Sequence, residues 1–430
     1  MDDNINQMSR ESKKERLREQ IVPEPGKETQ ESQQEIRAAH RSVIRKRLRI
    51  AGIVLAVVAV FGIGIYYYDI YHQYTGYQVA WEKEFASNTA QDDGQSATES
   101  GVVGYETFGS GLLKYSKDGA SYIDSRGKVV WNLGYEMKSP IVSINGEYAA
   151  IADQQGTSVY ICNLSGEQGQ ATTLLPIQRV TISAKGVTAV LEENSSASYI
   201  NMFHRDGSDL AISVKSLLSG DGYPIDLNFS PDGAQLVVPY LYIDGGILKS
   251  KVVFYNFVLG KDNGKRIVGS FYPEALGEGM VSRAHFMDDD HCVLFSDKGL
   301  VFVSTRVQTQ PSAQVPVEIA QKILTIDYTS QYVALITENA EGSEPYRLYV
   351  YRKDGSKVMD TPFNFQYSKM NLQKDRIYLY NESACQVYNL QGVKKLDATF
   401  DFMVSTVGPG SLPGTMLILN PSSIKEIKLQ

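Results

Sequence analysis

The sequence is poor in cysteine, and this excludes a disulfide-stabilised scaffold. Its 430 residues include only Cys162, Cys292 and Cys385, an odd number with wide spacing. An exported disulfide framework would contain more cysteines in even number, and no Cys-x-x-Cys pair is present to bind a metal. Each cysteine lies in an apolar, strand-like stretch (VYICNL, DHCVLF and SACQVY). We therefore expect three buried, reduced thiols that act as small apolar side chains.

The sequence also lacks the local motifs of common enzyme classes. It contains no Gly-x-Ser-x-Gly elbow, no His-Glu-x-x-His pair, no glycine-rich phosphate loop and no EF-hand loop. Carboxylate pairs of the glycosidase type stay open, because in a repeat fold they come from distant segments and show no local spacing. We expect no cofactor and assign no catalytic residue. Enzymatic activity stays undecided, with a non-catalytic role favoured.

One uncharged apolar run stands out against these absences. It extends from Ile50 to Tyr68 and contains 19 residues, IAGIVLAVVAVFGIGIYYY. As a helix it would be roughly 28 Å long, close to the thickness of the hydrocarbon layer of a bilayer. The run directly follows five basic residues: Arg41, Arg45, Lys46, Arg47 and Arg49. No Lys or Arg follows the run before Lys83. Positive charge beside a span stays cytoplasmic, so the sequence predicts a single-pass protein of the cell membrane with an extracytoplasmic C-terminal domain.

A cleaved signal peptide is the alternative interpretation of this run. Signal peptides have a short basic start, an apolar core of about 7–15 residues and a small-x-small cleavage site. Here 49 residues precede the core, and Tyr, Asp and Ile follow it instead of an Ala-x-Ala pattern. We therefore expect an uncleaved signal anchor. The tyrosines at its outer end are suited to the headgroup region of the membrane.

The formal charge of -7 is unevenly distributed along the chain. Residues 1–49 contain 12 Lys or Arg and 9 Asp or Glu, whereas residues 50–430 contain 30 and 40. The tail is thus basic (+3) and the remainder acidic (-10). An acidic C-terminal domain excludes nucleic-acid binding through bulk charge. The lipid bilayer is the one partner that the sequence indicates directly.

Composition divides the chain into four parts. Residues 1–45 form a polar and basic cytoplasmic tail that we expect to be disordered, with a helical stretch from Glu35 leading into the span. Residues 46–70 form the transmembrane helix. Residues 71–104 form a juxtamembrane stalk, which includes the small, polar segment Ser87–Gly101. Residues 105–430 form the large ectodomain.

The ectodomain has the pattern of a repeated β-hairpin. Short runs rich in Val, Ile, Tyr and Phe alternate with turn signals such as Asp-Gly, which recurs at Asp118, Asp206, Asp232 and Asp354. Hairpins begin at Ile141, Val180, Ile225, Ala284, Ile323 and Met370. This spacing of about 40–60 residues is typical of four-stranded propeller blades. We predict an all-β propeller of about seven blades, with six to eight allowed, in which C-terminal strands and strands after residue 101 together close the last blade.

Two segments resemble known propeller repeats. FSPDGAQLVV (Phe229–Val238) is similar to the hairpin of WD-repeat-like propellers, and SYIDSRGKVVWNL (Ser121–Leu133) resembles a stretch of quinoprotein-like propellers. Quinoprotein propellers dock each blade with tryptophan, however, and this chain has only Trp81 and Trp131. With the anchor, the chain from residue 40 onward resembles an uncharacterised family of bacterial membrane proteins with an extracytoplasmic WD-repeat-like propeller. The resemblance implies a Gram-positive source and no particular activity.

One cluster has the composition of a metal site. His285, Asp288, Asp290 and His291 lie within seven residues, and imidazole and carboxylate groups are ligands of zinc and manganese. The same residues occupy the place where the other hairpins have their polar turn, and Asp is favoured in turns for its backbone hydrogen bonds. We favour the turn and assign no metal ligand.

These observations favour a membrane-anchored propeller that acts as a binding, scaffold or sensing module at the bacterial cell envelope. Its ligand would be a protein or a fragment of the cell wall, bound on a propeller face. Two alternatives stay open. One is an envelope hydrolase or lyase with active residues dispersed over several blades, which a central pocket lined by carboxylates or histidines would favour. The other is an assembly factor for a surface or secretion complex.

Overall fold

The computed structural model describes residue 14 and residues 28–84, 102–258, 267–271, 279–305, 313–420 and 423–430. The chain divides into two compact units, Met1–His72 and Gln73–Gln430. The predicted linker Ser87–Gly101 and most of the predicted disordered tail lie outside the described residues.

The first unit contains the long helix α2 (Glu28–Tyr71). It begins before Glu35, where the sequence favoured a helical start, so the C-terminal part of the predicted disordered tail is helical. The segment Ile50–Tyr71 has a mean hydropathy of 2.4 and is long and apolar enough to cross a membrane. It has no charge before Asp69 and no proline to interrupt the helix. The predicted apolar helix is therefore confirmed, and its insertion into a membrane stays a prediction.

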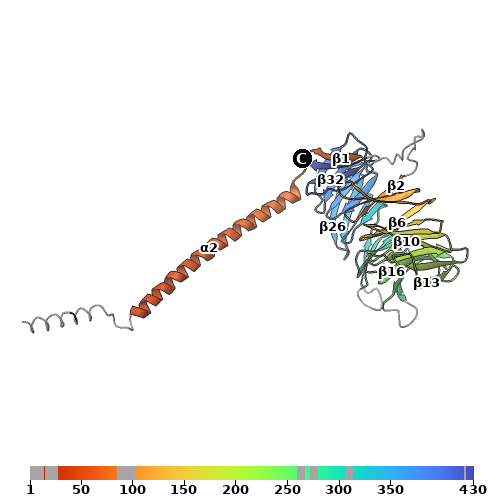
Figure 1. Cartoon of the computed structure of the whole chain (residues 1–430), viewed down its shortest axis with the longest axis horizontal. Coiled ribbons are helices and arrows are strands. Elements are labelled where there is room, and N and C mark those ends of the chain that lie inside the picture. Colours follow the sequence, from red (N-terminus) through yellow and green to blue (C-terminus); the bar gives the residue numbers. More distant parts are fainter. Residues whose placement is uncertain are drawn as a thin grey trace, which may run out of the picture. The chain divides into compact units, whose positions relative to one another are not determined.

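The second unit is a β-propeller of eight blades, each an antiparallel sheet (Figure 1). The range of six to eight blades predicted from the sequence includes this number. The strands of blades 1 to 4 are β2 (Val102–Phe108), β3 (Gly111–Ser116), β4 (Gly119–Ile123), β5 (Val129–Gly134); β6 (Pro140–Asn145), β7 (Tyr148–Asp153), β8 (Ser158–Asn163), β9 (Gly166–Thr172); β10 (Ile177–Ile182), β11 (Thr188–Glu193), β12 (Ala197–Phe203), β13 (Asp209–Leu217); and β14 (Tyr223–Pro224), β15 (Asn228–Phe229), β16 (Gln235–Asp244), β17 (Ile247–Asn256), β18 (Ile267–Phe271). In blade 4 both β14 and β15 pair with β16, so together they replace a single first strand.

Blades 5 to 7 follow the same order as the first three. Their strands are β19 (Val281–Phe286), β20 (His291–Ser296), β21 (Gly299–Ser304), β22 (Ala313–Glu318); β23 (Ile323–Tyr328), β24 (Tyr332–Glu338), β25 (Tyr346–Arg352), β26 (Lys357–Phe363); and β27 (Lys369–Gln373), β28 (Arg376–Tyr380), β29 (Ala384–Asn389), β30 (Lys394–Thr399). The hairpin turns explain this regularity. Gly146, Gly207, Gly233 and Gly355 have φ values of 59°, 83°, 74° and 83°, a conformation that glycine adopts without strain.

Blade 8 closes the ring with strands from both ends of the propeller. It contains β31 (Thr406–Pro409), β32 (Thr415–Leu419), β33 (Ser423–Leu429) and, at its outer edge, β1 (Tyr77–Glu84). In Figure 1 the orange β1 lies among the blue C-terminal strands. The prediction that strands after residue 101 complete this blade is therefore wrong. The strand that completes it is β1, which lies within the predicted stalk. Its own sequence does not show this role, because its partner strand β33 is at the distant C-terminus.

The apolar core consists of eight clusters, one between each pair of neighbouring blades. The first and second blades share the cluster around Phe108 and Ile151, and the eighth and first share a smaller one around Leu419 and Ile424 with Trp81 and Leu112. The other six follow in order around the ring. The three cysteines are free and buried, as the sequence predicts. Because each blade packs on two neighbours, the ring positions the inner ends of all first strands around one channel.

Candidate binding site

One residue on each first strand occupies an equivalent position in its blade. We call these residues the inner ring. In seven blades the inner-ring residue lies opposite the second or third residue of the blade's second strand. In blade 4 it lies opposite Val237 of β16. The inner ring consists of Glu106, Ser143, Thr181, Asn228, His285, Asp327, Asn371 and Gly408. First strands of successive blades contact one another along much of the circle. Seven of the eight positions thus bring a polar or ionisable side chain to the channel.

Most inner-ring side chains bond the next blade. The Ser143 Oγ accepts the N–H of Ile182 at 3.3 Å, and the Thr181 Oγ1 accepts that of Phe229 at 3.3 Å. In the same way Asn228 accepts the N–H of Phe286 at 2.7 Å, and Asp327 accepts that of Leu372 at 2.6 Å. Each donor directly follows the inner-ring residue of its own blade. The repeated bond therefore fixes neighbouring first strands in register.

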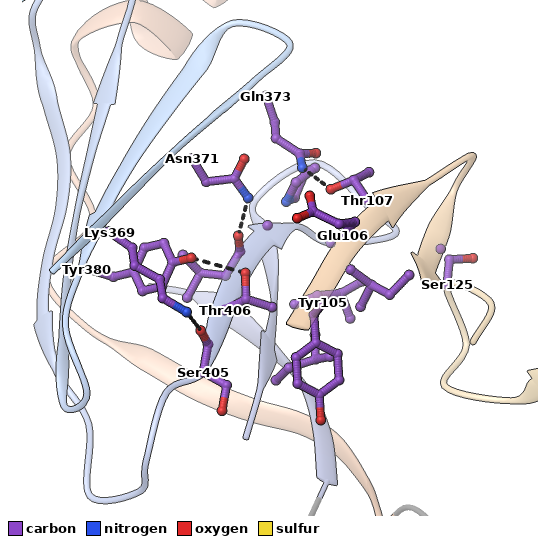
Figure 2. A pocket seen from close by; sticks show the side chains of 18 of the residues that line it. Tyr105, Glu106, Thr107, Ser125, Lys369, Asn371, Gln373, Tyr380, Ser405 and Thr406 are labelled. Carbon is purple, nitrogen blue, oxygen red and sulfur yellow. Dashed lines mark hydrogen bonds between the residues drawn. The ribbon is translucent and has the colours of Figure 1, made fainter. Parts of the chain in front are cut away.

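The ring is interrupted where blade 8 meets blade 1. Gly408 has no side chain, and a Cβ built on it would meet no atom within 4 Å. The Glu106 carboxylate forms no hydrogen bond or ion pair among the described residues, so blade 1 has no such bond to blade 2. A cavity of about 980 Å³ opens here, lined by residues of blades 1, 6, 7 and 8. Figure 2 shows Glu106 and Thr107 of β2 and Lys369, Asn371 and Gln373 of β27 around it.

The cavity contains two carboxyl groups that are costly to ionise. Burial, and then the nearby Asp327 carboxylate, raise the pKa of Glu106, and the Lys369 ammonium acts weakly in the opposite direction. Burial raises the pKa of Asp327 to about 6, although the N–H groups of Leu372 and Tyr328 stabilise its anion. Glu106 is exposed and Asp327 is half-buried, and both line the cavity. A perturbed acid in a concave site is a common sign of a functional position.

A second polar group lies farther around the channel. Burial raises the pKa of Asp226 to about 6, and Arg283, whose Nε is 4.0 Å from the Asp226 Oδ2, lowers it in part. The ring of His285 lies 4.1 Å from that of Tyr328, and burial lowers the pKa of His285 to about 3. The imidazole is therefore neutral at physiological pH. These residues belong to blades 4, 5 and 6 and do not line the cavity at Glu106.

The four residues with the composition of a metal site are only partly brought together. The Asp288 Oδ1 accepts the N–H groups of Asp290 and His291 at 2.9 and 2.8 Å, and its Oδ2 accepts the Lys353 ammonium at 2.6 Å. Burial raises the pKa of Asp288, but these bonds outweigh it and hold the value at about 2. The His291 Nδ1 lies 2.8 Å from the same carboxylate, whereas His285 contacts Tyr328. Within the described ranges, no group of three or more His, Cys, Asp or Glu could hold a metal ion.

The inner ring was not predicted from the sequence. The predicted hairpins, from IVSING to MNLQKD, contain six of the eight residues, and each of the six is a polar or ionisable residue between two apolar or aromatic ones. That repeated residue was the signal available. Glu106 and Gly408 lie outside the aligned hairpins. Arg41, Arg45, Lys46, Arg47 and Arg49 lie on α2, and their role in orientation stays a prediction.

The fold defines the class of this protein as an eight-bladed β-propeller that follows an apolar helix. The chain belongs to the family of unknown function DUF5711, whose sequence model matches residues 70–429. No curated protein matches the sequence. The resemblance to an uncharacterised propeller family is thus confirmed.

Solved propellers of other proteins resemble the chain only remotely. BamB from Moraxella catarrhalis shares 11% identity at a TM-score of 0.46, over 82% of this chain and 100% of BamB. Apo AztD from Citrobacter koseri shares 10% at a TM-score of 0.49, over 70% and 87% of the two chains. The Pan2 WD40 domain of Neurospora crassa shares 11% at 0.39, over 68% and 88%. Likenesses at this level carry no argument about what the chain binds.

Proposed function

We propose that this protein is a single-pass, membrane-tethered binding module whose propeller lies on the outer side of the cell membrane. The observation that carries the proposal is the exposure of α2. Leu55 and Phe61 are 73% and 72% exposed, and the apolar residues lie on all sides of the helix. So large an uncovered apolar surface is unfavourable in water, whereas a bilayer would cover it and the helix satisfies its own backbone hydrogen bonds.

The orientation follows from the residues at the two ends of the helix. The basic residues between Arg41 and Arg49 precede the apolar segment and would stay in the cytoplasm. Tyr66, Tyr67 and Tyr71 lie at the other end, each more than half exposed, and their rings are suited to the outer headgroup region. Tyr67 and Tyr71 stack with ring centroids 6.1 Å apart. On this proposal residues 1–45 are the cytoplasmic tail and residues 71–104 lead into the ectodomain.

Topology can be tested by cysteine labelling. The native thiols are buried, and burial raises the pKa of Cys162 to about 12, so a maleimide should leave them unmodified. Ser195→Cys places a thiol on an exposed turn, and Ser9→Cys places one in the tail. A membrane-impermeant maleimide should label Ser195→Cys in intact cells and Ser9→Cys only after lysis. The reverse pattern would overturn the orientation, and equal labelling of both would show that the protein does not cross the membrane.

The binding role is supported by the closed ring and its polar cavity. Among the described residues a rigid scaffold presents a concave site of about 980 Å³, the kind of place where small ligands bind. Crosslinking in intact membranes with the ectodomain as bait, with wall fragments screened in parallel, tests this role. A reproducible protein partner or a saturable wall ligand supports it. If neither is found and loss of the gene leaves the envelope unchanged, a binding role at the envelope is contradicted.

The enzyme alternative has one observation in its favour. The cavity is lined by three carboxylates, Glu106, Asp124 and Asp327, as a hydrolase with dispersed residues would require. Two of them are already engaged, because Asp124 accepts the N–H of Arg126 at 2.9 Å and Asp327 accepts that of Leu372. Only Glu106 is unengaged, so binding is the better-supported function. Turnover of wall fragments by the purified ectodomain, abolished in Glu106→Gln, would make the enzyme alternative the better-supported function.

A further inference from the structure

The cavity at Glu106 lies where Gly408 leaves a gap in the inner ring. At four ring positions a side chain accepts a hydrogen bond from the next first strand, but Gly408 has no side chain and the space beside it stays open. The opening lies beside four polar residues of two blades: Glu106, Lys369, Asn371 and Gln373. A ligand in this space would therefore meet side chains from both sides of the interruption.

The hydrogen-bond donors of this lining are mostly engaged with the protein itself. The Asn371 amide nitrogen donates to the Val407 carbonyl at 2.8 Å, and the Gln373 amide nitrogen donates to the Thr107 hydroxyl at 2.5 Å (Figure 2). The Lys369 ammonium donates to the Ser405 carbonyl at 3.3 Å. The oxygen atoms of the two amides accept no hydrogen bond among the described residues. These four residues therefore offer a ligand chiefly hydrogen-bond acceptors.

Glu106 is the strongest of these acceptors. It forms no hydrogen bond or ion pair with any described residue, and it lies on β2 at the interruption of the ring. Its two charged neighbours do not balance it, because the Asp327 carboxylate acts on it more strongly than the Lys369 ammonium. Glu106 is exposed and lines the cavity, so a group that enters can contact its carboxylate directly. A cation that entered the cavity would supply the missing partner.

We propose that this cavity binds its ligand through a primary ammonium group, with Glu106 as the anionic partner and the amide oxygens of Asn371 and Gln373 as further acceptors. An ammonium group has three donors and no acceptor, which matches this lining. The inference rests on the proposed binding role and adds the chemical class of the ligand. Free amines and the lysine side chains of peptides share this chemistry.

Binding of this kind depends on pH in a defined direction. The titratable groups that face Glu106 are Asp327, Lys369, Tyr115 and Tyr380. The two tyrosines keep their protons between pH 5 and 8, because burial raises the pKa of each above its usual value. Acidification protonates Asp327, whose pKa is about 6, and also Glu106, whose pKa is raised, so the loss of negative charge should lower the affinity for an ammonium ligand. A ligand that instead accepted a proton from a neutral Glu106 would bind more tightly at low pH.

The test measures binding to the full-length protein in detergent by calorimetry and ligand-observed NMR. The probes are spermidine and the blocked tripeptide acetyl-Ala-Lys-Ala-amide. The same tripeptide with an ε-acetylated lysine keeps the stem and an N–H donor but has no charge. We expect saturable binding of at least one ammonium probe and at least about tenfold weaker binding of the acetylated peptide. Preference for spermidine or for the peptide indicates which source of the amine the cavity accepts.

Two matched pairs of variants locate the site. Glu106→Gln should weaken binding by about tenfold or more, whereas Glu147→Gln removes the same charge from an exposed turn of blade 2 and should have no effect. Gly408→Trp should fill the cavity and abolish binding, because its Cβ meets no neighbouring atom. Gly134→Trp adds the same side chain at an equally open position on β5, away from the cavity, and should bind as the wild type does. Unchanged melting temperatures show that the variants fold.

Three results would overturn the inference. These are equal binding of the charged and acetylated peptides, unaltered binding by Glu106→Gln, and absence of binding by every ammonium probe. None of them affects the membrane topology or the crosslinking experiment that test the proposed function. If the propeller captures a partner from intact membranes but binds no ammonium probe, the binding role stands and the ligand class assigned to the cavity is wrong.

Discussion

At the scale of the residue, one position decides how each blade meets the next. The inner-ring residues differ in chemistry, from Ser143 to Asp327, yet four of them accept the same backbone N–H of the following blade. A buried N–H without a partner is costly, so each of these side chains satisfies a group that its neighbour leaves unpaired. Where a first strand presents such an N–H to its neighbour, this position needs a hydrogen-bond acceptor. Where the cavity opens, it does not.

This constraint predicts different effects for two similar substitutions. Thr181→Val removes the oxygen that accepts the buried N–H of Phe229, so the free energy of unfolding should fall by about 1–3 kcal/mol. Thr188→Val makes the same change at a fully buried threonine of β11 whose hydroxyl has no hydrogen-bond partner among the described residues. That substitution should be neutral or stabilising. Urea denaturation of the two variants measures the difference, and equal destabilisation would mean that the inter-blade bond contributes nothing.

Asp226 predicts how stability depends on pH. Its pKa is about 6 in the folded state and about 3.9 in an unfolded chain, so the folded state binds more protons between these values. Ionisation of Asp226 therefore lowers stability as the pH rises from about 4 to 6. Asp226→Asn should remove this loss, with a gain of up to about 3 kcal/mol at pH 7 and little change at pH 4. Its amide oxygen can still accept the N–H of Ala284.

Asp375→Asn is the matched control for this pH profile, because Asp375 is exposed. Its denaturation midpoints should follow those of the wild type at every pH. A profile of Asp226→Asn that is parallel to the wild type from pH 4 to 7 would contradict the raised pKa.

The sequence contains the inner ring without revealing its contacts. Thr181 and Asn371 occur in predicted hairpins, and their polarity between apolar neighbours is visible. Which atom each one bonds depends on the blade that follows, about 40–60 residues later. Glu106 was missed for the same reason, since its position in the cavity beside Asp327 and Lys369 is a property of the closed ring. The absence of local catalytic motifs was, by contrast, evident from the sequence alone.

At the scale of the element, the hairpins were predictable and the closure was not. Turn glycines and alternating apolar residues identify strands such as β6, β7 and β16 from local sequence. Strand β1 has the sequence YQVAWEKE and follows the apolar helix, so composition alone places it in a juxtamembrane stalk. Its pairing with β33 joins residues from opposite ends of the propeller sequence, such as Val79 and Ile427. No local pattern specifies such a pair.

The closing strand predicts a sharp boundary for a stable ectodomain. The Trp81 indole donates to the Glu426 carboxylate at 2.6 Å and packs against the cluster that joins blades 8 and 1. A fragment that begins at residue 85 loses β1 and exposes the edge of β33. Its melting temperature should be lower than that of residues 73–430 by about 5 °C or more, with more aggregate on size-exclusion chromatography. Identical melting curves would show that β1 is dispensable for closure.

At the scale of the whole molecule, the ring is closed by contacts between the two ends of the propeller. The Thr75 N–H donates to the carbonyl of Gln430 at 2.7 Å, and the Gln430 N–H donates to the Gly76 carbonyl at 2.9 Å. Each of the eight core clusters joins neighbouring blades, and no described member of any cluster precedes Tyr74. The propeller is therefore complete from residue 73 onward, and its stability should not depend on the helix before it.

This independence predicts the same melting temperature for two forms of the protein. Residues 73–430 in buffer and the full-length chain in mild detergent should unfold within about 2 °C of each other by near-ultraviolet circular dichroism, because the core that melts is the same. The same fragment in the same detergent is the control for any direct effect of the detergent. If the full-length chain melts several degrees higher than this control, residues 1–72 stabilise the propeller directly. In that case α2 is more than a tether, and the assignment of all stabilising contacts to the ring would be wrong.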